Sequence, residues 1–208
     1  MNIQKQVDKD HYAFEQYMQK CRWNSMWHQL DEVIKLKPDR VLEIGPGPGV
    51  FKNMANLFGV KVETLDLDPD LNPDHIGSAT SLPFPDNTFD VVCAFQMLEH
   101  LPYETSLDAF REMARVARKN VIISLPDSKT VWPHSLHVPR HGAVYWLMPR
   151  PFGGARQHKF DGQHYWEINK RGFALQKVVT DLSSVCDLIR TYRVNEHTYH
   201  RFFIFSVR

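Results

Sequence analysis

Three glycines at alternate positions form the part of the sequence best suited to hold a ligand. Gly45, Gly47 and Gly49 follow the apolar segment 40–44 and precede segment 50–58, whose apolar residues have helical spacing. Glycine lets a ligand lie directly against the backbone, where a Cβ atom would collide with it. A strand, a glycine-rich turn and a helix in this order are typical of a nucleotide-cofactor site. The alternative is a tight turn that holds no ligand.

The spacing within this loop also distinguishes between cofactors. A dinucleotide fingerprint needs a glycine at position 50, where the chain has Val50. Pro46 and Pro48 lack the N–H groups that would cradle a pyrophosphate. The glycine-lysine loop that binds nucleoside triphosphates does not occur in the sequence. The loop therefore disfavours both a nicotinamide oxidoreductase and a nucleoside-triphosphate enzyme.

An acidic residue ends the second apolar segment, 61–67, at a position suited to binding a ribose. There, the carboxylate of Asp66 can accept hydrogen bonds from both ribose hydroxyls of an adenosine. Asp68 competes for this role but lies beyond the apolar segment. We therefore assign the ribose to Asp66 and interpret Asp68, Asp70 and Asp74 as solvated loop acids.

Histidines and aromatic residues gather in segment 126–172, which is rich in proline and arginine and shows little periodicity. A long irregular segment within a domain is usually functional, so we expect a substrate cap over the carboxyl ends of the strands. Its histidines are His134, His137, His141, His158 and His164. Its aromatic residues, expected to form flat walls around an acceptor, are Trp132, Tyr145, Trp146, Phe152, Tyr165 and Trp166.

Two histidine patterns within this segment are candidates for chemistry. His164 is the best candidate for a general base, although it could equally fix the cap by binding a backbone carbonyl. The spacing of His134, His137 and His141 would suit zinc on a helix, but nearby prolines break such a helix. We therefore expect no metal site.

Strand and helix patterns alternate along the rest of the chain. The apolar segments that predict buried strands are 40–44, 61–67, 90–95 and 120–125. The segments with helical spacing are 50–58, 106–116 and 170–185. Segments 186–194 and 199–207 predict a terminal antiparallel hairpin. The order predicts an α/β fold with a doubly wound, mostly parallel seven-stranded sheet and a cap insertion after the fifth strand.

We interpret residues 1–208 as a single domain with four parts. Residues 1–38 form leading helices, and residues 39–125 form the cofactor-binding half. Residues 126–170 form the substrate cap, and residues 171–208 form the terminal helix and hairpin.

Composition excludes several other classes of protein. The 208 residues are 43% hydrophobic and carry a net charge of +1, which argues against bulk attraction to nucleic acid or to an anionic membrane. The sequence contains neither a run long enough for a membrane span nor a signal-peptide core. Three widely separated cysteines indicate reduced thiols, so we expect a cytoplasmic protein.

Several linked motifs in residues 41–126 resemble those of class I S-adenosylmethionine-dependent methyltransferases, in particular the type 11 methyltransferase domain. These motifs are the glycine loop at 41–51, Asp-Leu-Asp-Pro at 66–69, the segment 77–92 and Leu-Glu-His-Leu at 98–101. The resemblance implies a Rossmann-like fold, S-adenosylmethionine as the cofactor and methyl transfer as the activity.

The resemblance also implies which residues bind this cofactor. In the family, the glycine-loop positions surround the methionine and ribose parts, Asp66 binds the ribose, and Leu67 lies against the adenine. Gln96 matches a residue near the methionyl end. Relatives commonly have an acid where this chain has Ser78, so discrimination of adenine is expected to be weaker. The matching residues are Glu43, Gly45, Gly47, Gly49, Asp66, Leu67, Ser78, Ala79, Leu82 and Gln96.

The sequence thus favours methyl transfer to a small-molecule acceptor, O-directed rather than N- or C-directed. The excess of basic residues in the cap indicates an anionic or sugar-like acceptor. A non-catalytic cofactor-binding protein that acts as a partner or regulator is the alternative. Nucleic-acid methylation is disfavoured by the neutral charge balance, and the oligomeric state stays open.

Overall fold

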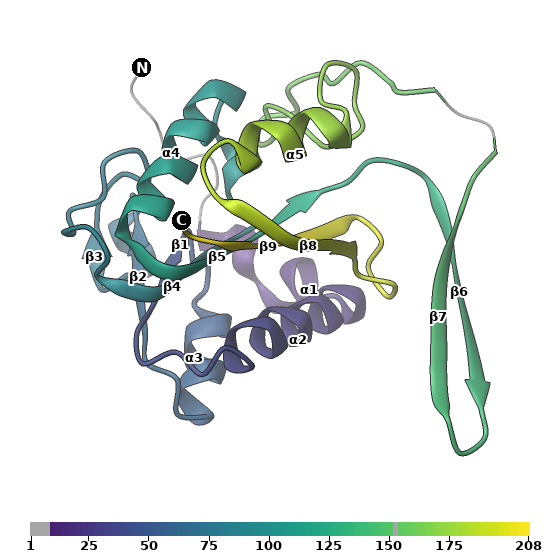
Figure 1. Cartoon of the computed structure of the whole chain (residues 1–208), viewed down its shortest axis with the longest axis horizontal. Coiled ribbons are helices and arrows are strands. Elements are labelled where there is room, and N and C mark those ends of the chain that lie inside the picture. The colour runs from purple at the N-terminus through teal and green to yellow at the C-terminus, as the bar shows by residue number, and fades with distance from the viewer. Residues whose placement is uncertain (1–8, 152–153) are drawn as a thin grey trace.

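Residues 9–151 and 154–208 are described by the computed structural model, and seven of their strands form one sheet (Figure 1). These strands are β1 (Val41–Ile44), β2 (Val62–Asp66), β3 (His75–Ile76), β4 (Phe89–Phe95), β5 (Ala117–Pro126), β8 (Asp187–Arg193) and β9 (His200–Ser206). Their order in the sheet is β3-β2-β1-β4-β5-β9-β8. The first five are parallel, whereas β9 runs antiparallel to both β5 and β8. The predicted fold class is confirmed.

Helices cover both faces of this sheet, as Figure 1 shows. Helices α4 (Tyr103–Val116) and α5 (Leu175–Ser183) lie on one face. The other face is covered by α1 (Phe14–Tyr17), α2 (Lys20–Ile34) and α3 (Val50–Leu57). Three short 3-10 turns are η1 (Lys9–Tyr12), η2 (Pro69–Leu71) and η3 (Leu98–His100).

The core lies in two layers because the central strands are buried on both faces. All residues of β4 are buried. Val92 packs in the cluster that includes Phe110 of α4, whereas Val91 packs in the cluster that includes Phe51 of α3. Continuous apolar strands of this kind are typical of parallel sheets that helices cover on both sides.

The leading helix α2 packs less completely than its apolar spacing predicts. Val33 is buried, but the Trp23 and Trp27 side chains are 48% and 58% exposed. With Met54 and Phe58 they line an apolar groove between α2 and α3. Both tryptophan side chains therefore stay partly exposed in this groove instead of packing on the sheet.

Part of the expected cap is a regular hairpin. Strands β6 (Val131–Val138) and β7 (Gly142–Pro149) pair antiparallel and extend away from the main sheet (Figure 1). His134 stacks on Trp146 across the two strands, with ring centroids 5.3 Å apart. The prediction of an irregular segment over the strand ends is wrong for these residues. The prolines argued against strands, but the β-branched and aromatic residues around them favour strands.

The aromatic walls expected of the cap are also dispersed. Trp166 is buried in the core, with its ring centroid 4.9 Å from that of Tyr103. Trp132, Tyr145 and Trp146 are on the exposed hairpin. Phe152 lies outside the described residues. In the described ranges, no helix is both long and apolar enough to cross a membrane.

Candidate functional site

The predicted cofactor residues meet where the strand order reverses, between β1 and β4. A crevice opens at the carboxyl ends of the strands at such a point. In the register of the sheet, Glu43 of β1 pairs with Thr64 of β2 and with Cys93 of β4. Asp66, the last residue of β2, and Gln96, directly after β4, therefore lie at the same edge of the sheet, on either side of β1 and its glycine loop.

The glycine loop requires glycine for two physical reasons. Gly45, Gly47 and Gly49 have φ values of +68°, +54° and +71°, which L side chains rarely adopt. A Cβ atom on Gly45 would collide with the side chain of Met97, and one on Gly47 would lie 3.0 Å from Cε1 of Tyr12. The loop is therefore a tight cradle.

Glu43 places a buried carboxyl group at the base of this cradle. Its Oε2 atom has no hydrogen-bond partner among the described residues. Burial raises the pKa of Glu43 to about 8, although the charge of Lys52 partly opposes this shift. The side chain lines a small cavity of about 30 Å³ together with Tyr17, Arg22 and Gln96. A carboxyl group and a guanidinium group thus line one cavity.

The N-terminal segment contributes residues that the sequence analysis missed. Tyr12 lies over Gly47, and burial, with Tyr17 and the charges of Asp66 and Asp68, raises its pKa to about 12. The guanidinium of Arg22 lies over the Tyr17 ring, 4.4 Å from its centroid. No local pattern connects these side chains with the glycine loop, so only the fold brings them together.

The acids after β2 have different environments. Asp66 accepts a hydrogen bond from the backbone N–H of Asp68 at 2.9 Å, and burial raises its pKa. Asp68 is 8% exposed, so its interpretation as a solvated loop acid is wrong. Its backbone turns at η2, where its Oδ1 accepts from the N–H of Asp70 at 3.0 Å. Asp68 is therefore buried at this turn.

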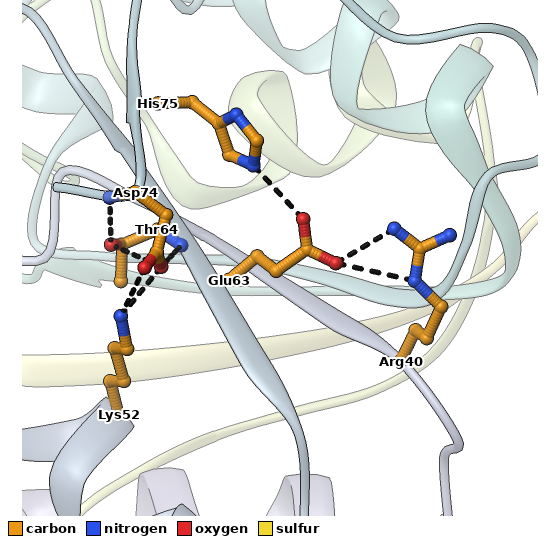
Figure 2. Close-up of polar contacts among 6 residues, drawn as sticks. All are labelled: Arg40, Lys52, Glu63, Thr64, Asp74 and His75. Atoms are coloured by element: carbon orange, nitrogen blue, oxygen red, sulfur yellow. Dashed lines mark hydrogen bonds and ion pairs between the residues drawn. The ribbon is translucent and has the colours of Figure 1, made fainter.

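Asp74 is a structural acid, as Figure 2 shows. Its carboxylate accepts from Lys52 Nζ at 2.6 Å and from both the backbone N–H and the hydroxyl of Thr64, at 2.8 and 2.9 Å. Nearby, Glu63 binds Arg40 at 2.7 Å and His75 at 2.9 Å. Asp74 is an exposed loop acid, as the sequence predicted, and its contacts also join α3 to β2 near the cradle.

The expected adenine-side residues lie after β3. Ala79 and Leu82 are buried, and the Leu82 N–H donates to Glu112 Oε2 at 2.8 Å. The hydroxyls of Ser78 and Thr80 are 2.9 Å apart. Leu67, at the end of β2, is 40% exposed. These positions form a rim of small and apolar side chains.

Gln96 follows β4 with a φ of +54°. Its Nε2 atom donates to Ser124 Oγ at 3.2 Å, and its backbone N–H donates to the Ser124 carbonyl at 3.0 Å. Two bonds to β5 hold the side chain at the strand ends, in the strained conformation that functional positions often show.

His164 lies at the same edge, in the part of the cap that returns to the sheet. The backbone N–H of Tyr165 donates to the Glu99 carbonyl at 2.9 Å, and that of Ile168 donates to the Pro126 carbonyl at 2.9 Å. These bonds fasten the segment to the ends of β4 and β5.

A carboxylate orients the His164 ring. Its Nδ1 atom lies 3.4 Å from Glu167 Oε1, which also accepts from the Tyr199 hydroxyl at 2.7 Å. Burial alone would lower the pKa of His164, but the bond to Glu167 and the charge of Glu99 raise it. Burial alone would raise the pKa of Glu167, but bonds from His164 and Tyr199 bring it to about 2.

The fold is that of class I S-adenosylmethionine-dependent methyltransferases, as the motifs predicted. The chain belongs to the methyltransferase-domain family, whose model matches residues 10–178.

Known proteins are similar to this chain in sequence or in fold. An uncharacterized methyltransferase from Mycobacterium sp. (strain KMS) is 33% identical over 128 residues, which are 56% of this chain and 46% of that protein. The chain thus spans about half the length of this curated relative. A solved protein of Pyrococcus horikoshii OT3 has a TM-score of 0.64 at 16% identity, over 97% of this chain and 100% of that one. A SAM-dependent methyltransferase from Aquifex aeolicus has a TM-score of 0.60 at 15% identity, with the same coverage.

Proposed function

We propose that this protein transfers a methyl group from S-adenosylmethionine to a small-molecule acceptor in the cytoplasm. The observation that carries the proposal is the glycine cradle of this family, with the buried, unpartnered Oε2 of Glu43 at its base and Arg22 lining the same cavity. The described cysteines are free, which agrees with a reducing compartment.

The residues around the cradle fit the groups of this cofactor. Glu43 matches the ammonium of a methionine end, whose positive charge would favour the ionised carboxylate, and Arg22 matches its carboxylate by opposite charge. Asp66 would accept from the ribose hydroxyls. The rim of Leu67, Ser78, Ala79 and Leu82 would hold the adenine, with Ser78 as its hydrogen-bonding group. When bound, the cofactor supplies an electrophilic methyl carbon on a sulfonium.

The acceptor is proposed to bind beside Gln96 and His164, at the carboxyl ends of β4 and β5. We assign His164 the removal of a proton from an acceptor hydroxyl, with Glu167 orienting its ring. The acceptor oxygen then forms the new bond to the methyl carbon, and the electrons of the broken carbon–sulfur bond remain on sulfur. Close positioning of the two reactants alone can lower the barrier by roughly 7 to 11 kcal/mol.

An anionic or sugar-like acceptor is supported by the charge of the returning segment. Residues 154–172 carry the basic side chains Arg156, Lys159, Lys170 and Arg171. Lys170 is engaged by Glu167 at 3.5 Å, and the exposed Arg156, Lys159 and Arg171 face solvent. O-methylation is favoured because the candidate base matters for a hydroxyl more than for a neutral amine.

Thermal unfolding tests the cofactor directly. The full chain is heated in buffer alone and with S-adenosylmethionine, S-adenosylhomocysteine or NADH. A ligand at a hundred times its Kd adds about 2.7 kcal/mol of stability, since only the folded state binds it. Both adenosyl ligands should raise the Tm by several degrees, and NADH should not. No shift with either adenosyl ligand would contradict the proposal, and binding without turnover on a panel of hydroxylated acceptors would favour the non-catalytic alternative.

A further inference from the structure

One carboxylate and two imidazoles meet beside the cofactor cradle. Glu99 and His100 belong to η3, directly after β4, and His164 comes from the returning part of the cap. One ligand atom from each of the three side chains lies within 4.8 Å of the others. The rings of His100 and His164 meet edge to face, with centroids 5.0 Å apart. Oxygen and nitrogen donors at this separation can converge on one ion.

Glu99 is the unusual member of this cluster. Its side chain is 0% exposed, and neither carboxylate oxygen has a hydrogen-bond partner among the described residues. An ionised carboxylate is strongly disfavoured in the interior without a partner. A cation between Glu99 and the imidazoles would supply the missing charge.

A neighbouring group of ligands is less suitable. Asp161, His164 and Glu167 also lie within 4.8 Å of one another. However, Asp161 Oδ1 already accepts from the backbone N–H groups of Gln163 and His164, at 2.9 and 2.8 Å. Glu167 Oε1 already accepts from a tyrosine hydroxyl. Glu167 is better placed to orient His164 from Nδ1, which is how carboxylates commonly hold ligating histidines.

We propose that Glu99, His100 and His164 bind one divalent cation, which in turn binds an oxygen of the acceptor. Two imidazoles and one carboxylate suit ions such as Mn²⁺ or Zn²⁺ and leave positions open for water and a substrate oxygen.

This inference rests on the proposed function and refines the role of His164. A cation lowers the pKa of a bound hydroxyl, so the acceptor proton can pass to solvent before the oxygen attacks the methyl carbon. In the metal-bound enzyme, His164 is a ligand in place of a base. The histidine spacing visible in the sequence lies instead in segment 134–141, where prolines argued against a metal site, and the fold places two of these histidines on the exposed β6 strand.

Calorimetric titration tests the site. The full chain is first treated with a chelator, the chelator is removed, and the protein is then titrated with Mn²⁺ and, in a separate experiment, with Zn²⁺. Wild type should bind one equivalent of at least one ion. Glu99→Gln and His164→Ala should each weaken this binding at least about tenfold. His137→Ala, a histidine of the exposed hairpin, is the matched control and should bind as wild type does. Circular dichroism checks folding, and two separate variants protect the test if one does not fold.

The same samples are then heated with S-adenosylhomocysteine. Cofactor binding that persists in Glu99→Gln while ion binding falls would support the inference. Ion binding that is absent from wild type, or equal in wild type and both site variants, would overturn it and return His164 to the role of base. Loss of the cofactor shift from wild type itself would instead contradict the proposed function, so the two failures are distinguishable.

Discussion

Gly45→Ala is expected to destabilise the protein more than the matched substitution Gly59→Ala. Both glycines have positive φ, +68° and +82°. The backbone strain on alanine is therefore similar, roughly 1 to 2 kcal/mol. At Gly59, no described atom lies within 4 Å of the new Cβ atom, whereas at Gly45 it would collide with Met97. Overpacking of this kind adds typically about 1 to 3 kcal/mol.

Urea unfolding of the two variants and wild type measures this difference. Gly45→Ala should unfold at a lower urea concentration than Gly59→Ala, and its Tm should fall by roughly 2 to 4 °C more per additional kcal/mol. Calorimetry with S-adenosylhomocysteine should show weakened binding for Gly45→Ala alone. Met97→Ala removes the Met97 Cγ atom, with which the new Cβ atom would collide. The double variant with Gly45→Ala should therefore lose less stability than the two single losses added together. Equal stability of the two glycine variants would refute the account of a tight cradle.

Three further substitutions test other parts of the structure. Asp66→Asn should weaken S-adenosylhomocysteine binding by about ten- to a hundredfold at an unchanged Tm, as expected for the loss of hydrogen bonds to a charged group. A larger effect from Asp68→Asn in the same calorimetry would assign ribose binding to Asp68. Replacing residues 131–149 with two glycines should leave the Tm within about 2 °C of wild type. The reason is that β6 and β7 pair with each other and that the Arg150 N–H already donates to the Thr130 carbonyl, at 3.3 Å, across the base of the hairpin. A large drop in Tm would show that the hairpin supports the core. Glu43 has a folded-state pKa of about 8, above its unfolded value, so its contribution to stability is present at pH 4 and is lost as the pH rises toward 8. Urea unfolding without cofactor should therefore show a weaker loss of stability between pH 5 and pH 8 in Glu43→Gln than in wild type, and parallel profiles would contradict the shifted pKa.

Local patterns in the sequence determined much of the fold. Strand β4 appears in the sequence as a continuous apolar segment because both of its faces are buried, and that requirement acts on each residue separately. The glycine loop is equally readable, because positive φ and close approach select glycine at Gly45, Gly47 and Gly49 whatever lies elsewhere in the chain. These constraints operate within a few residues, so one sequence reveals them.

The composition of the site was decided only by the tertiary structure. Tyr12 covers Gly47, and Glu99 lies beside His164, although each pair is distant in the chain. The β6–β7 hairpin shows the same limit. Its two strands pair locally, but their direction away from the main sheet depends on contacts outside the hairpin. Contacts of high sequence separation follow from the packing of whole elements, which no periodicity records. The sequence therefore identified the glycine loop, and the fold identified the side chains that face it.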